Sequence, residues 1–313
     1  MIVVAGEALV DLVAEDDGRF RAVPGGSPAN VAVGLARLGQ RTQMLVRLGT
    51  GRFGRIIRDH LAGNSVGLDL AVDAAEPATV AVVALDEAGH ASYDFYVDRT
   101  ADWGWSTTEL PAALPAGTAA LCTGSLALAL EPGASLLTDL MRRESARGIS
   151  VVLDPNLRPA LLGDRTAARR RLEAQVSTAD VVKVSDEDLA WLTPGESPAD
   201  VAARWLELGP TLVVVTRGSA GASALSHGGA RVDVPVHSVQ VVDTVGAGDA
   251  FTAGLVDALG RHDLLGGGAR ARLGRCDSAT LRAILDHATL VAALTCARRG
   301  ADPPTAADVD AAS

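Results

Sequence analysis

The sequence predicts an α/β fold in which a mostly parallel central sheet is flanked by helices and a small separate β-sheet forms a lid. From about residue 118, short solid apolar runs alternate with helical stretches, which is typical of parallel strands covered on both faces. Between residues 66 and 97 apolar and polar residues alternate instead, which indicates strands with one wet face. A glycine-rich turn between a predicted strand and a helix near residue 245 adds a candidate anion site.

The composition favours one compact unit, so we expect residues 1–313 to form a single domain with the lid as a lobe. The 313 residues are 48% hydrophobic, which allows a large core and argues against disorder. A formal net charge of −10 argues against nucleic acid or an anionic membrane as the main partner. The three cysteines are widely spaced, as expected for reduced thiols. No segment approaches the roughly 20 apolar residues that span a bilayer, so we expect a soluble, cytoplasmic protein.

The first strands place one carboxylate in a polar position. Residues 2–5 form an apolar strand, and in the next strand Asp11 points away from the face that Val10 and Leu12 share. Asp11 is therefore either an exposed edge-strand residue or part of a binding site.

A double glycine precedes the first helix. Ser27 suits the N-cap of this helix, Pro28 its first helical position, and Gly39 its C-terminal end. A well-capped helix explains the pattern by itself. Adjacent glycines and a first-turn amide would also allow close approach to a polyol. The candidates for that role are Gly25, Gly26 and Asn30.

The lid is predicted from residues of about 9–24 and 66–104. A buried strand at 43–48 and a glycine turn at 49–54 come between these segments. The runs 68–72, 79–85 and 93–97 alternate in the manner of half-exposed strands. An independent β-domain would show the same strands without closing a site.

The parallel strands are expected at residues 119–122, 151–153, 181–184 and 212–215. Ligands bind beyond the carboxyl ends of such strands. The residues that follow each strand are polar, and they include Asp154, Asn156, Arg158, Ser185, Glu187, Asp188, Thr216 and Gly218. We therefore expect a site along this edge.

The glycine-rich turn, residues 243–251, follows an apolar run at 239–242 that we expect to form a strand. The amides of Gly246, Ala247 and Gly248 could converge on one anion at the positive end of a helix dipole. Asp249 lies in the first helical turn, where it could accept a proton beside that anion. Asp249 could instead simply complement the helix dipole. A dinucleotide-binding turn is set aside, because Phe251 stands where the third glycine would be required.

This stretch closely resembles the D-T-x-G-A-G-D signature of the ribokinase-like, or PfkB, sugar kinases, and the resemblance covers almost the whole chain. It implies a ribokinase-like fold. It also implies that Asp249 deprotonates the sugar hydroxyl and that the amides of residues 246–248 hold the transferring phosphoryl group. In the same family a Gly-Glu-x-x-x-Asp start and a G-G-x-x-x-N signature contact the sugar, which assigns that role to Asp11, Gly25, Gly26 and Asn30.

Further segments resemble the fructokinases of this family. Residues 154–158 match the D-x-N-x-R element typical of fructokinases and 2-keto-3-deoxygluconate kinases, and residues 99–102 resemble the lid-return stretch of fructokinases, so Asn156, Arg158 and Arg99 become sugar-site candidates. Residues 183–188 resemble the K-x-N-x-x-E region that orders Mg²⁺ near ATP. Ser185 replaces the usual Asn and Asp188 the usual Glu, with Glu187 as a substitute. The nucleotide-binding candidates are Lys183, Ser185, Thr216, Gly218 and Gly221.

The resemblance implies transfer of the ATP γ-phosphoryl group to a primary hydroxyl of a small sugar, most consistent with fructose. A 2-keto-3-deoxygluconate kinase, a ribokinase or nucleoside kinase, and a binding regulator without turnover are the alternatives. The implied cofactors are ATP, Mg²⁺ and K⁺, with K⁺ near Asp243, Val245 and Gly300. Such lids often pair between subunits, so we expect a homodimer.

Overall fold

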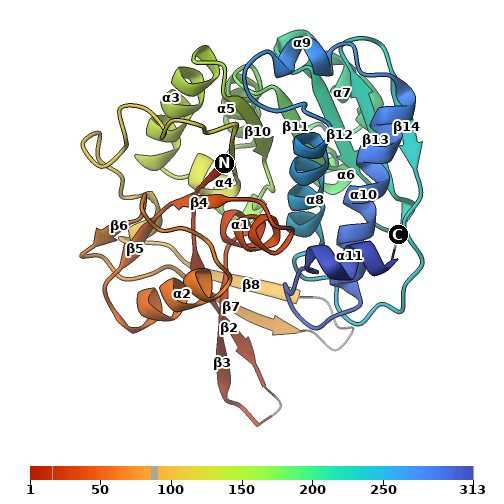
Figure 1. Cartoon of the computed structure of the whole chain (residues 1–313). Helices are drawn as coiled ribbons and strands as arrows, with labels where there is room; N and C mark the ends of the chain where they lie inside the picture. The colour runs from red at the N-terminus through yellow and green to blue at the C-terminus, as the bar shows by residue number, and fades with distance from the viewer. Residues whose placement is uncertain (16, 86–90, 313) are drawn as a thin grey trace.

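The computed structural model describes residues 1–15, 17–85 and 91–312, and its core is an eight-stranded sheet (Figure 1). The strand order is β14-β13-β12-β11-β10-β9-β1-β4. All neighbours are parallel from β4 to β12, whereas β13 and β14 are antiparallel. The strands are β1 (Ile2–Ala5), β4 (Thr42–Leu45), β9 (Ala120–Gly124), β10 (Ser150–Asp154), β11 (Val181–Ser185), β12 (Leu212–Thr216), β13 (Ala222–Ser226) and β14 (Arg231–Val234). The predicted parallel strands and the α/β fold class are confirmed.

Helices cover both faces of this sheet (Figure 1). One layer contains α1 (Ser27–Arg37), α8 (Ala247–Arg261) and α10 (Ser278–Cys296), and the other contains α3 (Gly133–Ala146), α5 (Arg165–Val176), α6 (Asp186–Leu192) and α7 (Pro198–Leu208). Alternate residues of a strand enter opposite layers: Val4 belongs to the core cluster that includes α1 and α8, whereas Val3 belongs to the cluster that includes α3 and α7. Solid apolar strands follow from this two-sided burial. The remaining helices are α2 (Arg52–Gly63), α4 (Pro159–Leu162), α9 (Ala269–Leu273) and α11 (Ala306–Ala312), and short 3₁₀ helices are η1 (Ala101–Trp103), η2 (Ser125–Leu128) and η3 (Gly218–Ala220).

The lid is a separate four-stranded sheet in the order β3-β2-β7-β8, and it projects from one end of the molecule (Figure 1). Its strands are β2 (Leu9–Ala14), β3 (Phe20–Gly25), β7 (Val80–Leu85) and β8 (Ala91–Tyr96). The predicted lid segments include residues 16 and 86–90, which lie outside the described residues. Asp11 belongs to β2, an interior strand of this sheet, and so it is no edge-strand residue.

Four local predictions are wrong. The strand expected at 43–48 breaks after Leu45, and β5 (Arg47–Gly49) pairs with β6 (Val72–Ala74) outside the lid, so the run at 68–72 contributes little strand. The run 239–242 is an irregular loop, in which Val241 is 62% exposed, because no neighbouring strand is available to pair with it. Ser27 is the first residue of α1 and not its N-cap, a position held by Gly26 at φ 100°.

The helix α10 also departs from expectation, because its 19 residues are long and apolar enough to cross a membrane by length and composition. Half of the relevant window is buried inside the protein. The helix packs against α8 in the core, with residues such as Ile284, Ala288 and Val291 fully buried. Its apolar character is therefore explained by burial in the α-helical layer.

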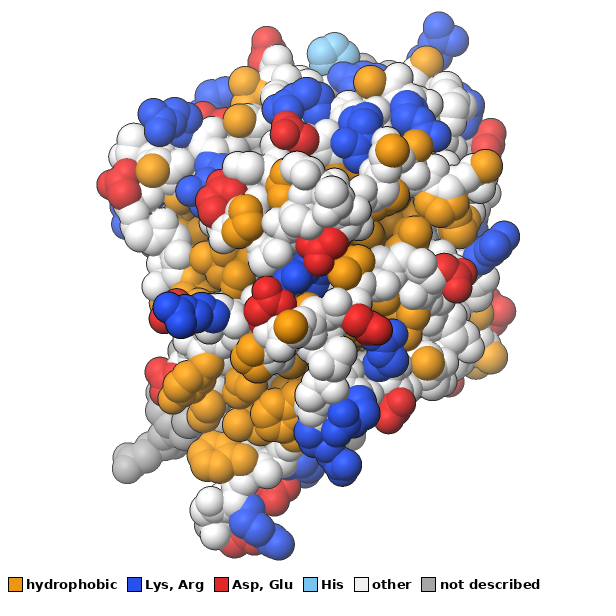
Figure 2. Space-filling view, turned by 90° about the vertical axis from the view of Figure 1, so that its left-hand side faces the viewer, with side chains coloured by type: hydrophobic (Ala, Val, Ile, Leu, Met, Phe, Trp, Pro, Cys, Tyr) orange, Lys and Arg blue, Asp and Glu red, His pale blue; other side chains and the backbone are white. Residues whose placement is uncertain are grey.

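Hydrophobic side chains gather at the lid end of one face (Figure 2). Of the described lid residues, Phe20 and Tyr96 are 54% and 62% exposed. A contiguous patch of exposed apolar side chains marks a candidate surface for a partner.

Candidate active site

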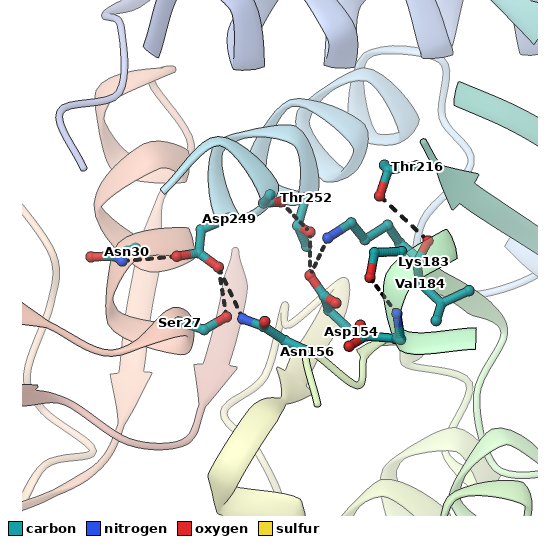
Figure 3. Close-up of polar contacts among 12 residues, drawn as sticks. Ser27, Asn30, Asp154, Asn156, Lys183, Val184, Thr216, Asp249 and Thr252 are labelled. Carbon is teal, nitrogen blue, oxygen red and sulfur yellow. Dashed lines mark hydrogen bonds and ion pairs between the residues drawn. The ribbon is translucent and has the colours of Figure 1, made fainter. Parts of the chain in front are cut away.

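Asp249, in the first turn of α8, lies where three elements meet (Figure 3). Its carboxylate accepts hydrogen bonds from Ser27 Oγ at 2.7 Å, from Asn30 Nδ2 at 2.8 Å and from Asn156 Nδ2 at 3.4 Å. Ser27 and Asn30 come from the first turns of α1, and Asn156 comes from the loop after β10. Candidates that are far apart in the sequence are thus assembled around one carboxylate.

Charged groups from the lid and the β10 loop surround this cluster. Burial raises the pKa of Asp11 to about 6; the positive charge of Arg158 opposes that shift and the charge of Asp249 adds to it. Arg158 Nη1 donates to Asn156 Oδ1 at 2.6 Å, which fixes the amide that faces Asp249. Burial also raises the pKa of Asp249 above its ordinary value, against the hydrogen bonds that it accepts. Such a carboxylate is a stronger base than one in water.

The turn before α8 presents free amides, though not the full predicted set. Gly246 is the N-cap and adopts a left-handed φ of 76°, which favours glycine. The Ala247 amide donates to Thr244 O at 3.2 Å and is engaged in the turn. The Ala247 amide, which we expected to bind the anion together with those of Gly246 and Gly248, is therefore not available for it. Within the described part of the chain, the amides of Gly246, Gly248 and Asp249 have no acceptor. They provide donors at a helix N-terminus, where negative charge is stabilised.

A buried ion pair lies beneath this turn. Lys183 Nζ is 2.9 Å from Asp154 Oδ2, with side chains 5% and 6% exposed. The Thr252 hydroxyl lies 2.7 Å from the same oxygen and 3.0 Å from Gly248 O (Figure 3). A Cβ placed on Gly248 would be 3.3 Å from Lys183 Nζ. Lys183 was expected in the nucleotide site, but its ammonium is buried under the glycine turn because Lys183 alternates with Val182 and Val184, which face the other helical layer.

A cavity of about 560 Å³ opens on the other side of the turn. This size suits a nucleotide-sized ligand. Its lining combines polar strand-end residues with the valines of the loop that precedes α8. The predicted nucleotide-binding residues that line it are Ser185, Thr216, Gly218 and Gly221. Val239 and Val241, which we expected in a strand, form an apolar wall of this cavity instead.

The acidic residues at the start of α6 have different roles in the structure. Ser185 is the N-cap of this helix and accepts a hydrogen bond from Asp188 N at 3.0 Å. Asp188 Oδ1 accepts from Leu157 N at 3.1 Å, and burial raises the pKa of Asp188 to about 6. Glu187 is exposed and lines the cavity. Of the two carboxylates proposed for Mg²⁺, Glu187 is the one that faces the cavity.

The candidate monovalent-cation residues are close together. Asp243 Oδ1 accepts from Val245 N at 3.1 Å and Oδ2 accepts from Gly300 N at 2.8 Å. The amides of Val242 and Asp243 donate to Cys296 O. The loop before α8 is therefore tied to the end of α10.

The structure places one predicted site residue apart from the others. Sequence reasoning also missed several residues of the site. Arg99 is exposed, with a left-handed φ of 54°, and the described structure gives it no contact with the Asp249 cluster. Ser27 was assigned only to a cap, although its hydroxyl donates to Asp249. Thr252 was not singled out, and Asp154 was expected only as one of the polar residues at the strand ends. For Asp154 the available signal was its position at the carboxyl end of β10, where parallel strands place ligand-binding residues.

A carboxylate beside free N-terminal amides, at the mouth of a nucleotide-sized cavity, is the arrangement of a phosphotransferase that acts on a hydroxyl group. The model of the pfkB family carbohydrate kinases matches residues 1–307. The chain belongs to this family and is an ATP-dependent carbohydrate kinase.

Named relatives agree with this assignment. A fructokinase of Klebsiella pneumoniae is 37% identical over 263 residues, which cover 83% of this chain and 85% of that protein. The solved structure of Xylella fastidiosa fructokinase with bound ATP is 31% identical, with a TM-score of 0.91 and coverage of 99% of this chain and 97% of that one. A double mutant of fructokinase from Vibrio cholerae O395, bound to fructose, ADP and potassium ion, has a TM-score of 0.86 at 31% identity and the same coverage.

Proposed function

We propose that this kinase phosphorylates a primary hydroxyl of fructose. The observation that carries the proposal is the cluster around Asp249, where carboxylate, amide and guanidinium groups of α1, the β10 loop and the lid surround one point. Polyol recognition needs such a mixture of donors and acceptors. Relatives named fructokinase, one of them solved with fructose and ADP, support the choice of sugar.

In this proposal the sugar hydroxyl oxygen attacks the γ-phosphorus of ATP as the bond to the ADP oxygen breaks. Asp249 accepts the hydroxyl proton, and the amides of Gly246 and Gly248 stabilise charge on the transferred group. Asp11, Gly25, Gly26, Asn30, Asn156 and Arg158 orient the sugar. Phosphoryl transfer depends mainly on positioning and charge stabilisation, and these groups supply both.

The nucleotide occupies the 560 Å³ cavity, with its base against the exposed valines and its phosphates toward Gly248. Among the residues that the structure describes, no group of three His, Cys, Asp or Glu side chains could hold a metal ion. Mg²⁺ fits as an ion held mainly by ATP phosphates and water, with Glu187 as an outer ligand, which is its usual mode in kinases. There it would neutralise phosphate charge.

The proposal includes a dimer formed through the exposed face of the lid. Phe20 and Tyr96 supply apolar area on that sheet. We further propose that residues 1–313 act as one domain in the cytoplasm, with the lid as a lobe of that domain.

A sugar panel tests the substrate. We expect kcat/KM, measured as ADP formation, to be highest for fructose, because differential transition-state binding sets this ratio. A higher ratio for 2-keto-3-deoxygluconate, ribose or a nucleoside would contradict the fructose assignment. Sugar binding without ADP formation would instead indicate a regulator.

We also expect K⁺ to activate the enzyme. The Asp243 carboxylate holds together the segments at Val245 and Gly300, so a cation bound there would order the loop beside the glycine turn. Rates should be higher in K⁺ than in a bulky organic cation at the same ionic strength. Equal rates would mean that Asp243 serves only to fasten the loop.

A further inference from the structure

Asp102, in η1 directly after the lid, is almost fully buried at 1% exposure. The chain passes between the α/β body and the lid near residue 8, near residue 79 and again at residues 97–100. Asp102 Oδ1 accepts a hydrogen bond from Ala8 N at 2.9 Å. Its Oδ2 accepts from Thr79 N at 3.4 Å and from Thr79 Oγ1 at 2.5 Å. One carboxylate thus joins successive passages of the chain into the lid.

The surroundings of Asp102 extend this connection. The Thr79 hydroxyl lies 2.6 Å from that of Thr100, and Thr100 lies 2.9 Å from Val97 O. Thr79 and Thr100 are buried, at 0% and 6% exposure. On the body side, Glu7 Oε2 accepts from Ala127 N of η2 at 3.0 Å and is 1% exposed. The network therefore runs from the body, through the base of β2 and β7, to the end of the lid.

A buried carboxylate is an expensive way to make these hydrogen bonds. No basic side chain in the described parts of the chain forms an ion pair with Asp102. Burying an unpaired charge is unfavourable unless several donors compensate it. Three donors converge here, from the two residues that immediately precede β2 and β7. An apolar residue would be buried at lower cost, so we attribute the carboxylate to the geometry that its hydrogen bonds impose.

That geometry reaches the active site through β2. Ala8 immediately precedes β2, and Asp11 lies three residues further along the same strand. Asp11 and Asp249 are close enough for the charge of Asp249 to raise the pKa of Asp11. Because Asp11 belongs to β2, a small change in the direction of this strand would alter the separation of the two carboxylates. Displacements of about 1 Å in a positioned group can cost up to roughly 10²-fold in rate.

We propose that Asp102 is a positioning residue for the sugar: it fixes the angle at which β2 leaves the body, and thereby the distance of Asp11 from Asp249, without touching substrate. This inference rests on the proposed role of Asp11 in sugar binding. We expect nucleotide binding to be independent of Asp102, because the 560 Å³ cavity is lined by other elements.

The test is Asp102→Asn. The amide oxygen of asparagine can still accept from Ala8 or from Thr79. It cannot replace both carboxylate oxygens, because the amide nitrogen only donates. Loss of hydrogen bonds to a charged group changes an equilibrium by about tenfold or more. We expect KM for the sugar to rise about tenfold with KM for ATP within about twofold, and the amides of Ala8 and Thr79 to exchange hydrogen faster in the substrate-free protein.

Asp180→Asn is the matched control. Asp180 is also buried, at 7% exposure, and accepts from Val151 N at 2.8 Å, but it pairs with Arg270 Nη1 at 3.0 Å and lies before β11, at the amino-terminal end of that strand. It should lose stability without changing the ratio of the two KM values. Thr79→Val, which removes only the hydroxyl donor, provides a milder second variant should Asp102→Asn fold poorly. It should shift sugar KM in the same direction.

The outcomes separate this inference from the proposed substrate. KM is measured with whichever sugar the panel identifies, so failure of the fructose assignment leaves the test intact. The positioning role of Asp102 would be overturned if the sugar KM were unchanged in both Asp102→Asn and Thr79→Val, or if the KM values for sugar and ATP changed equally. Faster exchange at Ala8 and Thr79 with unchanged sugar KM would also overturn it, because the network would then be purely structural.

Discussion

Asp249→Asn should fold and bind ATP but lose at least about 10²-fold in kcat, because general-base contributions run to about 10²–10⁴-fold. The asparagine keeps the shape of the side chain and one acceptor for Ser27 or Asn30, but it lacks a basic carboxylate. Sugar affinity should change less than kcat, since proton transfer belongs to the transition state. Measurement of kcat, both KM values and the melting temperature on one preparation tests this expectation.

A purely structural role makes a different prediction for the same variant. A carboxylate that only complements the dipole of α8 contributes about 0.3–1 kcal/mol to stability, and turnover would stay nearly normal. The pH dependence adds a second criterion. Because burial raises the pKa of Asp249, the wild-type rate should decline with falling pH before the ordinary range of a carboxylate is reached. Near-normal turnover in the variant would rule out the assignment of Asp249 as base.

Lys183→Met should lower the free energy of unfolding by about 3–5 kcal/mol, the usual result of removing one partner from a buried ion pair. Asp154 would remain 6% exposed with its charge uncompensated, and only the Thr252 hydroxyl would still donate to it. Methionine fills a similar volume, so the loss would reflect charge more than packing. Urea unfolding at neutral pH measures the difference.

The double variant Lys183→Met with Asp154→Asn is the control for this prediction. It removes the unpaired charge while keeping a polar side chain near Thr252, so it should recover part of the lost stability. If the single variant loses less than about 1 kcal/mol, comparable to an exposed pair, the pair is not buried as the structure describes it.

Much of the fold could be predicted because the strongest signals are periodic. The strands at 151–153 and 181–184 are solid apolar runs, and their two-sided burial leaves few alternatives. The position of the site followed from the carboxyl ends of these strands. Asn156 and Asp249 were expected there and are in contact.

The remaining errors have a common cause, which is that composition does not reveal what a side chain faces. Val239 and Val241 have the β-branched character of a strand, but here they line a cavity because no strand lies beside them. Ser27 suits an N-cap, yet Gly26 occupies that position. The Ser27 hydroxyl is therefore free to donate to Asp249. Lys183 follows a motif associated with nucleotide, and only the three-dimensional packing reveals the ion pair beneath the turn.

The hydrogen bond between Ser27 and Asp249 joins residues that are 222 positions apart. A ribosome adding about 5–20 residues per second needs roughly 10–45 s to synthesise the chain between them. During that interval the first turns of α1 have no carboxylate to receive their donors, although β1 and β4 can already pair. The cluster around Asp249 therefore cannot form until α8 has been synthesised, because Ser27 and Asn30 donate to a carboxylate that lies in the first turn of that helix.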